Sequence, residues 1–107
     1  NPGTSAMKML MIVFRESISE QIHALMKDYA IMAYTELQNV SGRGETGPTL
    51  HFSLSAGANR MILAAIPEQM AYRVIEGLTR YRTEQLQQQG EDAFPLHVFV
   101  LPCEQVV

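Results

Sequence analysis

The chain has little of what marks secreted, membrane-spanning or nucleic-acid-binding proteins. Its single cysteine, Cys103, cannot form an internal disulfide. Only 8 lysines and arginines are scattered over 107 residues, and the formal net charge is -3, whereas a nucleic-acid surface needs clustered basic residues to neutralise phosphates. No charged start leads into a long apolar run of the kind found in a signal peptide or membrane span. We therefore expect a cytoplasmic protein that binds no DNA or RNA.

Catalytic groupings are also lacking. The serines of the sequence have no nearby histidine and acid in a recognised arrangement, and Cys103 shows no sign of an activated thiol. The carboxylates outside the helices look scattered and loop-borne, and we expect solvent around each of them: Glu36, Glu45, Glu91 and Asp92. The sequence therefore predicts a protein that is not an enzyme.

The first half of the chain follows the order strand, helix, strand. Residues 8–14 are an almost continuous apolar run, as expected of a strand buried on both faces. Apolar residues recur at helical spacing over residues 16–29, and Ser17 with Glu20 three residues later matches a capping box. His23 falls off the apolar stripe, so we expect it to be exposed to solvent. Residues 31–40 alternate without a helical stripe and predict a second strand.

The second half repeats this order. Residues 61–66 are apolar throughout and predict a third strand, and Pro67 suits the first position of a helix that runs to about residue 89. Gly90 can end that helix, and residues 96–101 predict the fourth strand. The inward stripe of the second helix is expected to be Ala71, Val74, Ile75 and Leu78. Residues 1–6 have no pattern before Met7, and we interpret them as a cloning remnant outside a single domain of residues 7–107.

The element order β-α-β-β-α-β predicts a ferredoxin-like fold, in which both helices cover one face of a four-stranded antiparallel sheet. The strands carry apolar residues at consecutive positions, so the other face of the sheet is also expected to be apolar. An apolar face of that size favours association. We therefore expect a homo-oligomer that packs sheet faces together, with a closed ring as the symmetric solution.

A glycine-rich loop connects the two halves. The segment Gly42-Arg43-Gly44-Glu45-Thr46-Gly47 matches the dinucleotide fingerprint G-x-G-x-x-G by letters. That fingerprint requires a helix to begin at once, and here Pro48 and an irregular stretch follow, so a Rossmann site is excluded. The glycines still allow close backbone approach to a ligand, and successive N–H groups can bind an anion. A flexible hairpin without a ligand is the alternative.

Four residues of metal-ligand type lie in the loop and around the last strand: His51, His97, Cys103 and Glu104. No C-x-x-C or H-x-x-x-H spacing joins them, so a metal site would have to be assembled across the fold or between subunits. For His97 alone, a hydrogen-bonded histidine in the core or in an interface is the favoured interpretation.

Several short segments, in order, resemble the PII signal-transduction proteins and their PII-like relatives. Met7-Lys8-Met9-Leu10 opens an apolar strand, and Thr35-Glu36-Leu37 precedes Ser41-Gly42-Arg43-Gly44, which is similar to the T-E-V strand and G-x-G turn of PII. Ile66-Pro67-Glu68-Gln69 is similar to V-P-D-E-Q. The final segment from Val98 to Val107 is similar to I-F-V-S-P-V-E-E-V-V. The likeness covers nearly the whole chain from Met7.

The resemblance implies a homotrimer that binds adenine nucleotides (ATP, ADP or AMP) or another small effector in clefts between subunits. It also implies a switch loop, the T-loop, at residues 41–57 that engages a protein partner such as a membrane transporter or an enzyme. Gly42 and Gly44 match the glycines at the base of the T-loop. The candidate binding residues are Gly42, Arg43, Gly44, Thr46 and Gly90.

The chain departs from the PII pattern at three places. Its loop is shorter than in nitrogen-regulatory PII proteins and lacks the tyrosine used for uridylylation. Only Gly90 corresponds to the phosphate-gripping turn T-G-x-x-G-D-G-K, and Glu91 and Asp92 there would repel a triphosphate. The sequence also stops at Val107, before the basic C-terminal segment that usually completes the ATP site. A divergent PII-like regulator is the first hypothesis. A trimeric metal-binding protein of the CutA type and a ligand-free interaction module are the alternatives.

Overall fold

The computed structural model describes residues 6–42, 58–89 and 94–107. The element order β-α-β-β-α-β is confirmed. A 3-10 turn, η1, precedes the first α-helix. The bounds are β1 (Met7–Arg15), η1 (Glu16–Ile18), α1 (Ser19–Asp28), β2 (Thr35–Val40), β3 (Asn59–Pro67), α2 (Glu68–Gln89) and β4 (Leu96–Pro102). Among the helices of these residues, none is long and apolar enough to cross a membrane.

The strands form one antiparallel sheet in the order β2-β3-β1-β4. The two long central strands pair over their whole length, from Met7 opposite Pro67 to Arg15 opposite Asn59. The apolar runs that predicted these strands are therefore at the centre of the sheet, where burial is greatest. β2 and β4 are the edge strands.

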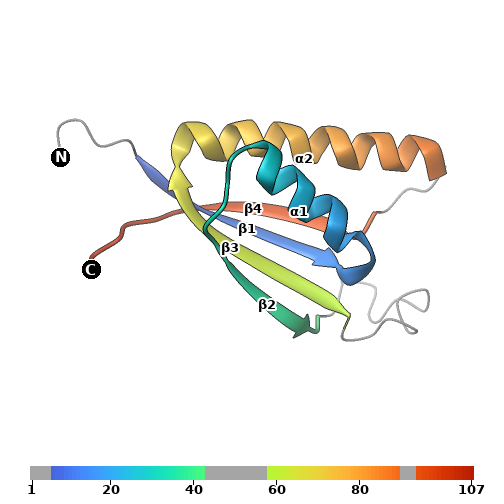
Figure 1. Cartoon of the computed structure of the whole chain (residues 1–107), viewed down its shortest axis with the longest axis horizontal. Helices are drawn as coiled ribbons and strands as arrows, with labels where there is room; N and C mark the ends of the chain where they lie inside the picture. The colour runs from blue at the N-terminus through green and yellow to red at the C-terminus, as the bar shows by residue number, and fades with distance from the viewer. Residues whose placement is uncertain (1–5, 43–57, 90–93) are drawn as a thin grey trace.

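Both helices cover the same face of the sheet, with α2 lying along its length and α1 crossing above β1, β2 and β3 (Figure 1). Side chains alternate along each strand, so every second residue of β1 and β3 points to this face. The core forms there between sheet and helices. Its largest fully buried side chains are Phe14, Leu10, Ile12, Ile22, Met26, Ile62, Leu78 and Val74.

The opposite face of the sheet is apolar, as the sequence predicted, and neither described helix covers it (Figure 1). Register places Met11 between Leu63 of β3 and Phe99 of β4 on this open face. Phe99 is 53% exposed, and Leu37 and Leu101 are also exposed. The open face also carries Met9, Val13, Met61, Ala65 and His97.

Helix α1 differs at both ends from the sequence expectation. The capping-box interpretation is wrong: Ser17 lies inside η1 and makes no cap, because an N-cap residue needs an extended backbone and that conformation falls at Arg15. The helix ends in a Schellman motif, in which Ala30 N–H donates to Lys27 O and Ile31 N–H donates to Met26 O. Ala30 adopts φ 62° there. Residues 31–34 connect to β2, which begins at Thr35 and not at residue 31.

Candidate functional site at one end of the sheet

One end of the sheet gathers the ends of several elements that are far apart in sequence. The end of β1, the end of β2, the start of β3, the end of α2 and the start of β4 all lie there (Figure 1). The N–H of Arg15 donates to Pro95 O at 3.2 Å, and the N–H of Glu16 donates to Ala58 O at 2.7 Å. The end of β1 is therefore joined both to the return from the glycine-rich loop and to the segment before β4.

The strand that enters the loop is irregular just before it. β2 pairs regularly with β3 from Thr35 to Leu37, and the register then shifts so that Val40 lies opposite Asn59. Asn39 has φ 58°, a left-handed conformation that asparagine tolerates better than most residues. This β-bulge turns the strand as it enters the loop.

Gly42 is the one predicted binding residue that the structure describes. It is exposed, and an added β-carbon would have no described atom within 4 Å. Neither crowding nor a left-handed φ in the described chain requires glycine at this position. The predicted residues Arg43, Gly44, Thr46 and Gly90 lie outside the described ranges, as do His51, Glu45, Glu91 and Asp92.

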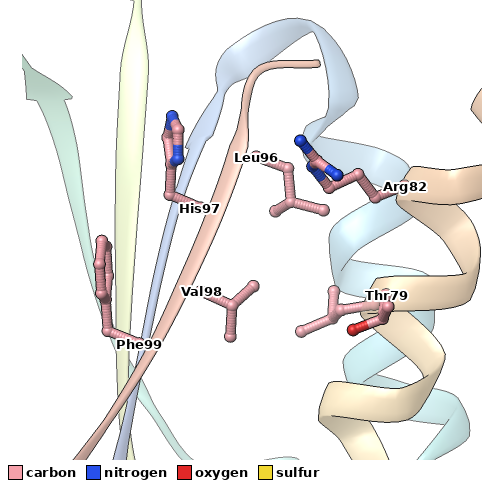
Figure 2. Close-up of a pocket in the computed structure, with 7 residues that line it drawn as sticks. Thr79, Arg82, Leu96, His97, Val98 and Phe99 are labelled. Atoms are coloured by element: carbon pink, nitrogen blue, oxygen red, sulfur yellow. The ribbon is translucent and has the colours of Figure 1, made fainter. Parts of the chain in front are cut away.

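A groove of about 320 Å³ lies between α2 and the edge strand β4. Leu96 and Val98 point from β4 toward Thr79 and Arg82 of α2, while His97 points to the other side of the strand (Figure 2). The groove includes Leu96 at the start of β4, so it adjoins the same end of the sheet as the loop base, by which we mean residues 40–42 and 58–59 on either side of the glycine-rich loop. Its lining mixes the apolar Leu78, Leu96 and Val98 with the hydroxyl of Thr79 and the positive charge of Arg82.

Next to the loop base, four charged or titratable side chains form a network that the sequence did not reveal. Arg60 on β3 donates through Nη1 to Glu36 Oε2 at 2.7 Å and through Nη2 to Glu16 Oε1 at 2.6 Å. His23 on α1 donates through Nε2 to the other oxygen of Glu36, at 2.5 Å. The expectation that Glu36 is solvated on a loop is therefore wrong: it lies on β2 with a side chain only 16% exposed.

His23 is likewise not simply exposed, because it packs against two aromatic rings as well as Glu36. Tyr34 stacks on its imidazole with ring centroids 6.3 Å apart, and Phe14 meets it edge-on at 6.5 Å. Helical spacing places His23 off the apolar stripe of α1, but β2 passes close to that side of the helix. No local sequence pattern encodes this proximity.

The electrostatics of this network follow from its burial and its hydrogen bonds. Burial acts to raise the pKa of the Glu36 carboxyl, but the hydrogen bonds from His23 and Arg60 and their charges outweigh it, so the pKa lies below the ordinary value. The hydrogen bond to Glu16, followed by that to Glu36, raises the pKa of Arg60. Glu36 is therefore held as a carboxylate at neutral pH.

The residues suggested as metal ligands do not come together in the part of the chain that is described. His97 is exposed on the open face and so is not a core histidine of this chain. Cys103 is half-buried beyond the end of β4. Within residues 6–42, 58–89 and 94–107, no group of three or more His, Cys, Asp and Glu side chains has the arrangement of a metal site.

Comparisons with known proteins agree with the resemblance seen in the sequence. A sequence model of the family described as nitrogen regulatory protein P-II matches residues 7–107. A search of curated proteins gave no match. The solved structures gave several matches to CPII from Thiomonas intermedia, a nitrogen regulatory PII-like protein.

The structure of CPII bound to ADP, AMP and bicarbonate is 27% identical to this chain, with a TM-score of 0.62 and 89% of each chain covered. CPII bound to ADP and bicarbonate is 28% identical, with a TM-score of 0.61 over 88% of this chain and 82% of that chain. A PII-like signaling protein from Thermus thermophilus is 18% identical, with a TM-score of 0.53 over 90% of this chain and 85% of that chain, and agrees in fold.

Proposed function

The chain belongs to the nitrogen regulatory protein P-II family, and on that premise we propose that it is a non-enzymatic, homotrimeric regulator in the cytoplasm that senses an adenine nucleotide. The family match over residues 7–107 is the observation that carries this proposal. The similarity to CPII in its complexes with ADP, AMP and bicarbonate supports the choice of ligand. Residues 7–107 form the regulatory domain, and residues 1–6 lie outside it.

The open face of the sheet supports the proposed subunit association. Three neighbouring strands present apolar side chains there, among them Met11, Leu63 and Phe99. Leaving such a face in water is unfavourable, and packing three copies around an axis covers it. The clefts between the subunits are the proposed nucleotide sites.

The proposed binding residues are Gly42, Arg43, Gly44, Thr46 and Gly90. No atom of the described residues lies within 4 Å of a β-carbon added at Gly42, so these residues leave room beside its backbone for a ligand or a neighbouring subunit. Glu91 and Asp92 follow Gly90 in sequence, and their charges oppose a triphosphate more than a mono- or diphosphate. We therefore propose AMP or ADP as the effector in preference to ATP.

Signalling is assigned to residues 41–57 as a switch loop that engages a partner, such as a membrane transporter or an enzyme. A switch requires that the effector bind two arrangements of the loop with different affinity. Ala58, which precedes β3, and Pro95, which precedes β4, are both hydrogen-bonded to the backbone at the end of β1, so a ligand bound at this end of the sheet is close to the start of β3.

Calorimetric titration of the native protein with AMP, ADP, ATP and GMP, with and without bicarbonate, tests this proposal. The expected result is saturable binding of AMP or ADP, weaker binding of ATP, and a ligand-dependent change in proteolysis within residues 41–57. Arg43→Ala is expected to weaken nucleotide binding, while Arg80→Ala on the exposed surface of α2 serves as the control. If no adenine nucleotide binds and the protein instead binds Zn²⁺ or Cu²⁺, the metal-binding alternative replaces the proposal.

A further inference from the structure

Apolar burial contributes little to holding β2 against the rest of the domain. None of its side chains is fully buried, and Leu37 points to the open face. Regular pairing with β3 covers Thr35 to Leu37 before the register shifts. The apolar core that fixes β1 and β3 under the helices therefore does little to fix the strand that enters the loop.

The network of Glu16, His23, Glu36 and Arg60 supplies the missing attachment. Glu36 lies opposite Ile62 in the register, and Ile62 is buried under the helices, so Glu36 and Arg60 share the helix-covered side of the sheet. The hydrogen bonds of Arg60 join β3 to β2 and to η1, and that of His23 joins β2 to α1. These side chains thus connect β2, β3, η1 and α1 to one another.

The network adjoins both strands that flank the loop. On the return side, Arg60 follows Ala58, whose carbonyl accepts the N–H of Glu16 at 2.7 Å. On the entry side, Glu36 precedes the bulge at Asn39. A displacement of either flanking strand must therefore lengthen or break a charged hydrogen bond.

Opening of such a network is cooperative. Glu36 and Arg60 have side chains only 16% and 18% exposed, and Arg60 Nε is buried with no hydrogen-bond partner among the described residues. If Arg60 leaves, Glu36 keeps only His23, and a largely buried carboxylate with reduced pairing is unstable. The arrangement therefore favours two states, fully joined or released.

We propose that Glu16, His23, Glu36 and Arg60 form a polar latch that holds β2 and the start of β3 against α1, and that its release is the conformational step that frees the base of the loop. The role of these four residues is to position β2 and the start of β3. The latch is a property of the free chain, while its use in signalling rests on the proposed function of residues 41–57.

Hydrogen exchange of the native protein, without added ligand, tests the latch. Arg60→Met keeps a flexible, unbranched apolar stem but removes the guanidinium with its charge and donors. It is expected to raise amide exchange in residues 35–42 and 58–61 by about 10- to 100-fold, the loss expected for hydrogen bonds to charged groups. Exchange in residues 8–14 and 70–78 should stay within about 3-fold of wild type, because a local release does not open the core.

Three further variants keep the outcome interpretable. Arg60→Lys should restore part of the protection, since an ammonium pairs with one carboxylate but lacks the fork of donors. If Arg60→Met does not fold, Glu36→Gln is the variant that tests the latch. Arg80→Met, on the exposed side of α2, is the matched control and should leave residues 35–42 unchanged. Unchanged exchange at residues 35–42 in both Arg60→Met and Glu36→Gln, or an equal rise in all peptides, overturns the latch.

The role in signalling has a separate readout. Addition of ADP or AMP to wild type is expected to change exchange at residues 35–42, and Arg60→Met is expected to reduce that change. If nucleotide binds and changes these residues equally in both proteins, the latch has no part in the switch and that half of the inference fails. If no nucleotide binds, the proposed function fails, whereas the latch stands on the ligand-free experiment.

Discussion

The ring of Tyr29 lies against the backbone of Gly77, so close that a β-carbon at Gly77 would be 2.5 Å from Cε2 of the ring. Tyr29 follows α1 and packs against the core, while Gly77 is in the middle of α2 and is buried. A glycine inside a helix costs about 1 kcal/mol relative to alanine. Its presence here allows α2 to approach the end of α1 closely.

Gly77→Ala is therefore expected to destabilise the protein in spite of the better helix propensity of alanine. Overpacking costs about 1–3 kcal/mol and the gain in propensity is about 1 kcal/mol, so a net loss of up to about 2 kcal/mol should appear in urea unfolding. In a Tyr29→Ala background the same substitution should become neutral or stabilising. A loss of equal size in both backgrounds would show that the Tyr29 contact is not the cause.

Ala30→Gly is expected to stabilise the protein. Ala30 ends α1 with φ 62°, a left-handed conformation that costs an L-residue about 1–2 kcal/mol and costs glycine little. Because glycine also loses more backbone entropy on folding, a net gain of about 0.5–1 kcal/mol is expected in the free energy of unfolding. Ala24→Gly, at an exposed position inside the same helix, is the control and should be destabilising by about 1 kcal/mol.

The sequence predicted the elements well where the signal is local. The apolar runs at residues 8–14, 61–66 and 96–101 became strands, and the stripe from Ala71 to Leu78 became the buried side of α2. The apolar open face followed from the same runs, because two helices cannot cover both faces. These features depend on neighbours within one turn or one strand.

The network around Arg60 could not be predicted, because His23 is 13 residues from Glu36 and Arg60 is 24 residues from it. Only the register that places Glu36 opposite Ile62, together with the position of α1 over β2, brings them together. The capping box predicted at Ser17 was wrong for a related reason. The spacing of Ser17 to Glu20 fits a helix N-cap, but Ser17 lies in a 3-10 turn. Gly42 stays a predicted ligand contact, as do Arg43, Gly44, Thr46 and Gly90.

Stability is expected to fall in acid partly through Glu36. Its pKa is lower in the folded chain than the ordinary value of 4.5. The carboxylate therefore contributes stability that is fully present above pH 4.5 and is lost as pH falls through the folded-state pKa. Glu36→Gln should cost about 1.5–3 kcal/mol at pH 7, the range for hydrogen bonds to a charged group.

Urea midpoints measured from neutral pH down to strongly acid pH check this expectation. The difference between wild type and Glu36→Gln should be constant near neutrality and should shrink at acid pH. Glu20→Gln is the control, because Glu20 is exposed on α1 and has no described partner, and its difference from wild type should be small throughout. A difference for Glu36→Gln that persists unchanged into strong acid would contradict the charged hydrogen bonds of this carboxylate.

The open face of the sheet gives a prediction about subunit association. Phe99 is 53% exposed on β4 and adjoins Met11 in the register, so a second copy that covers this face must bury both side chains. A carboxylate inserted there would have to lose its hydration without a partner, which is strongly unfavourable. Phe99→Glu is therefore expected to shift the protein from the proposed trimer toward monomer in light scattering coupled to size exclusion. It should also lower the melting temperature.

Tyr72→Glu is a matched control for this substitution, since Tyr72 is 49% exposed on α2, the helix that covers the opposite face of the sheet. Its phenol lies in water in the single chain, so a carboxylate at that position keeps its hydration unless α2 itself is an interface. A trimer that survives Phe99→Glu would exclude the open face as the association surface, whereas a trimer lost with Tyr72→Glu would move that surface to α2.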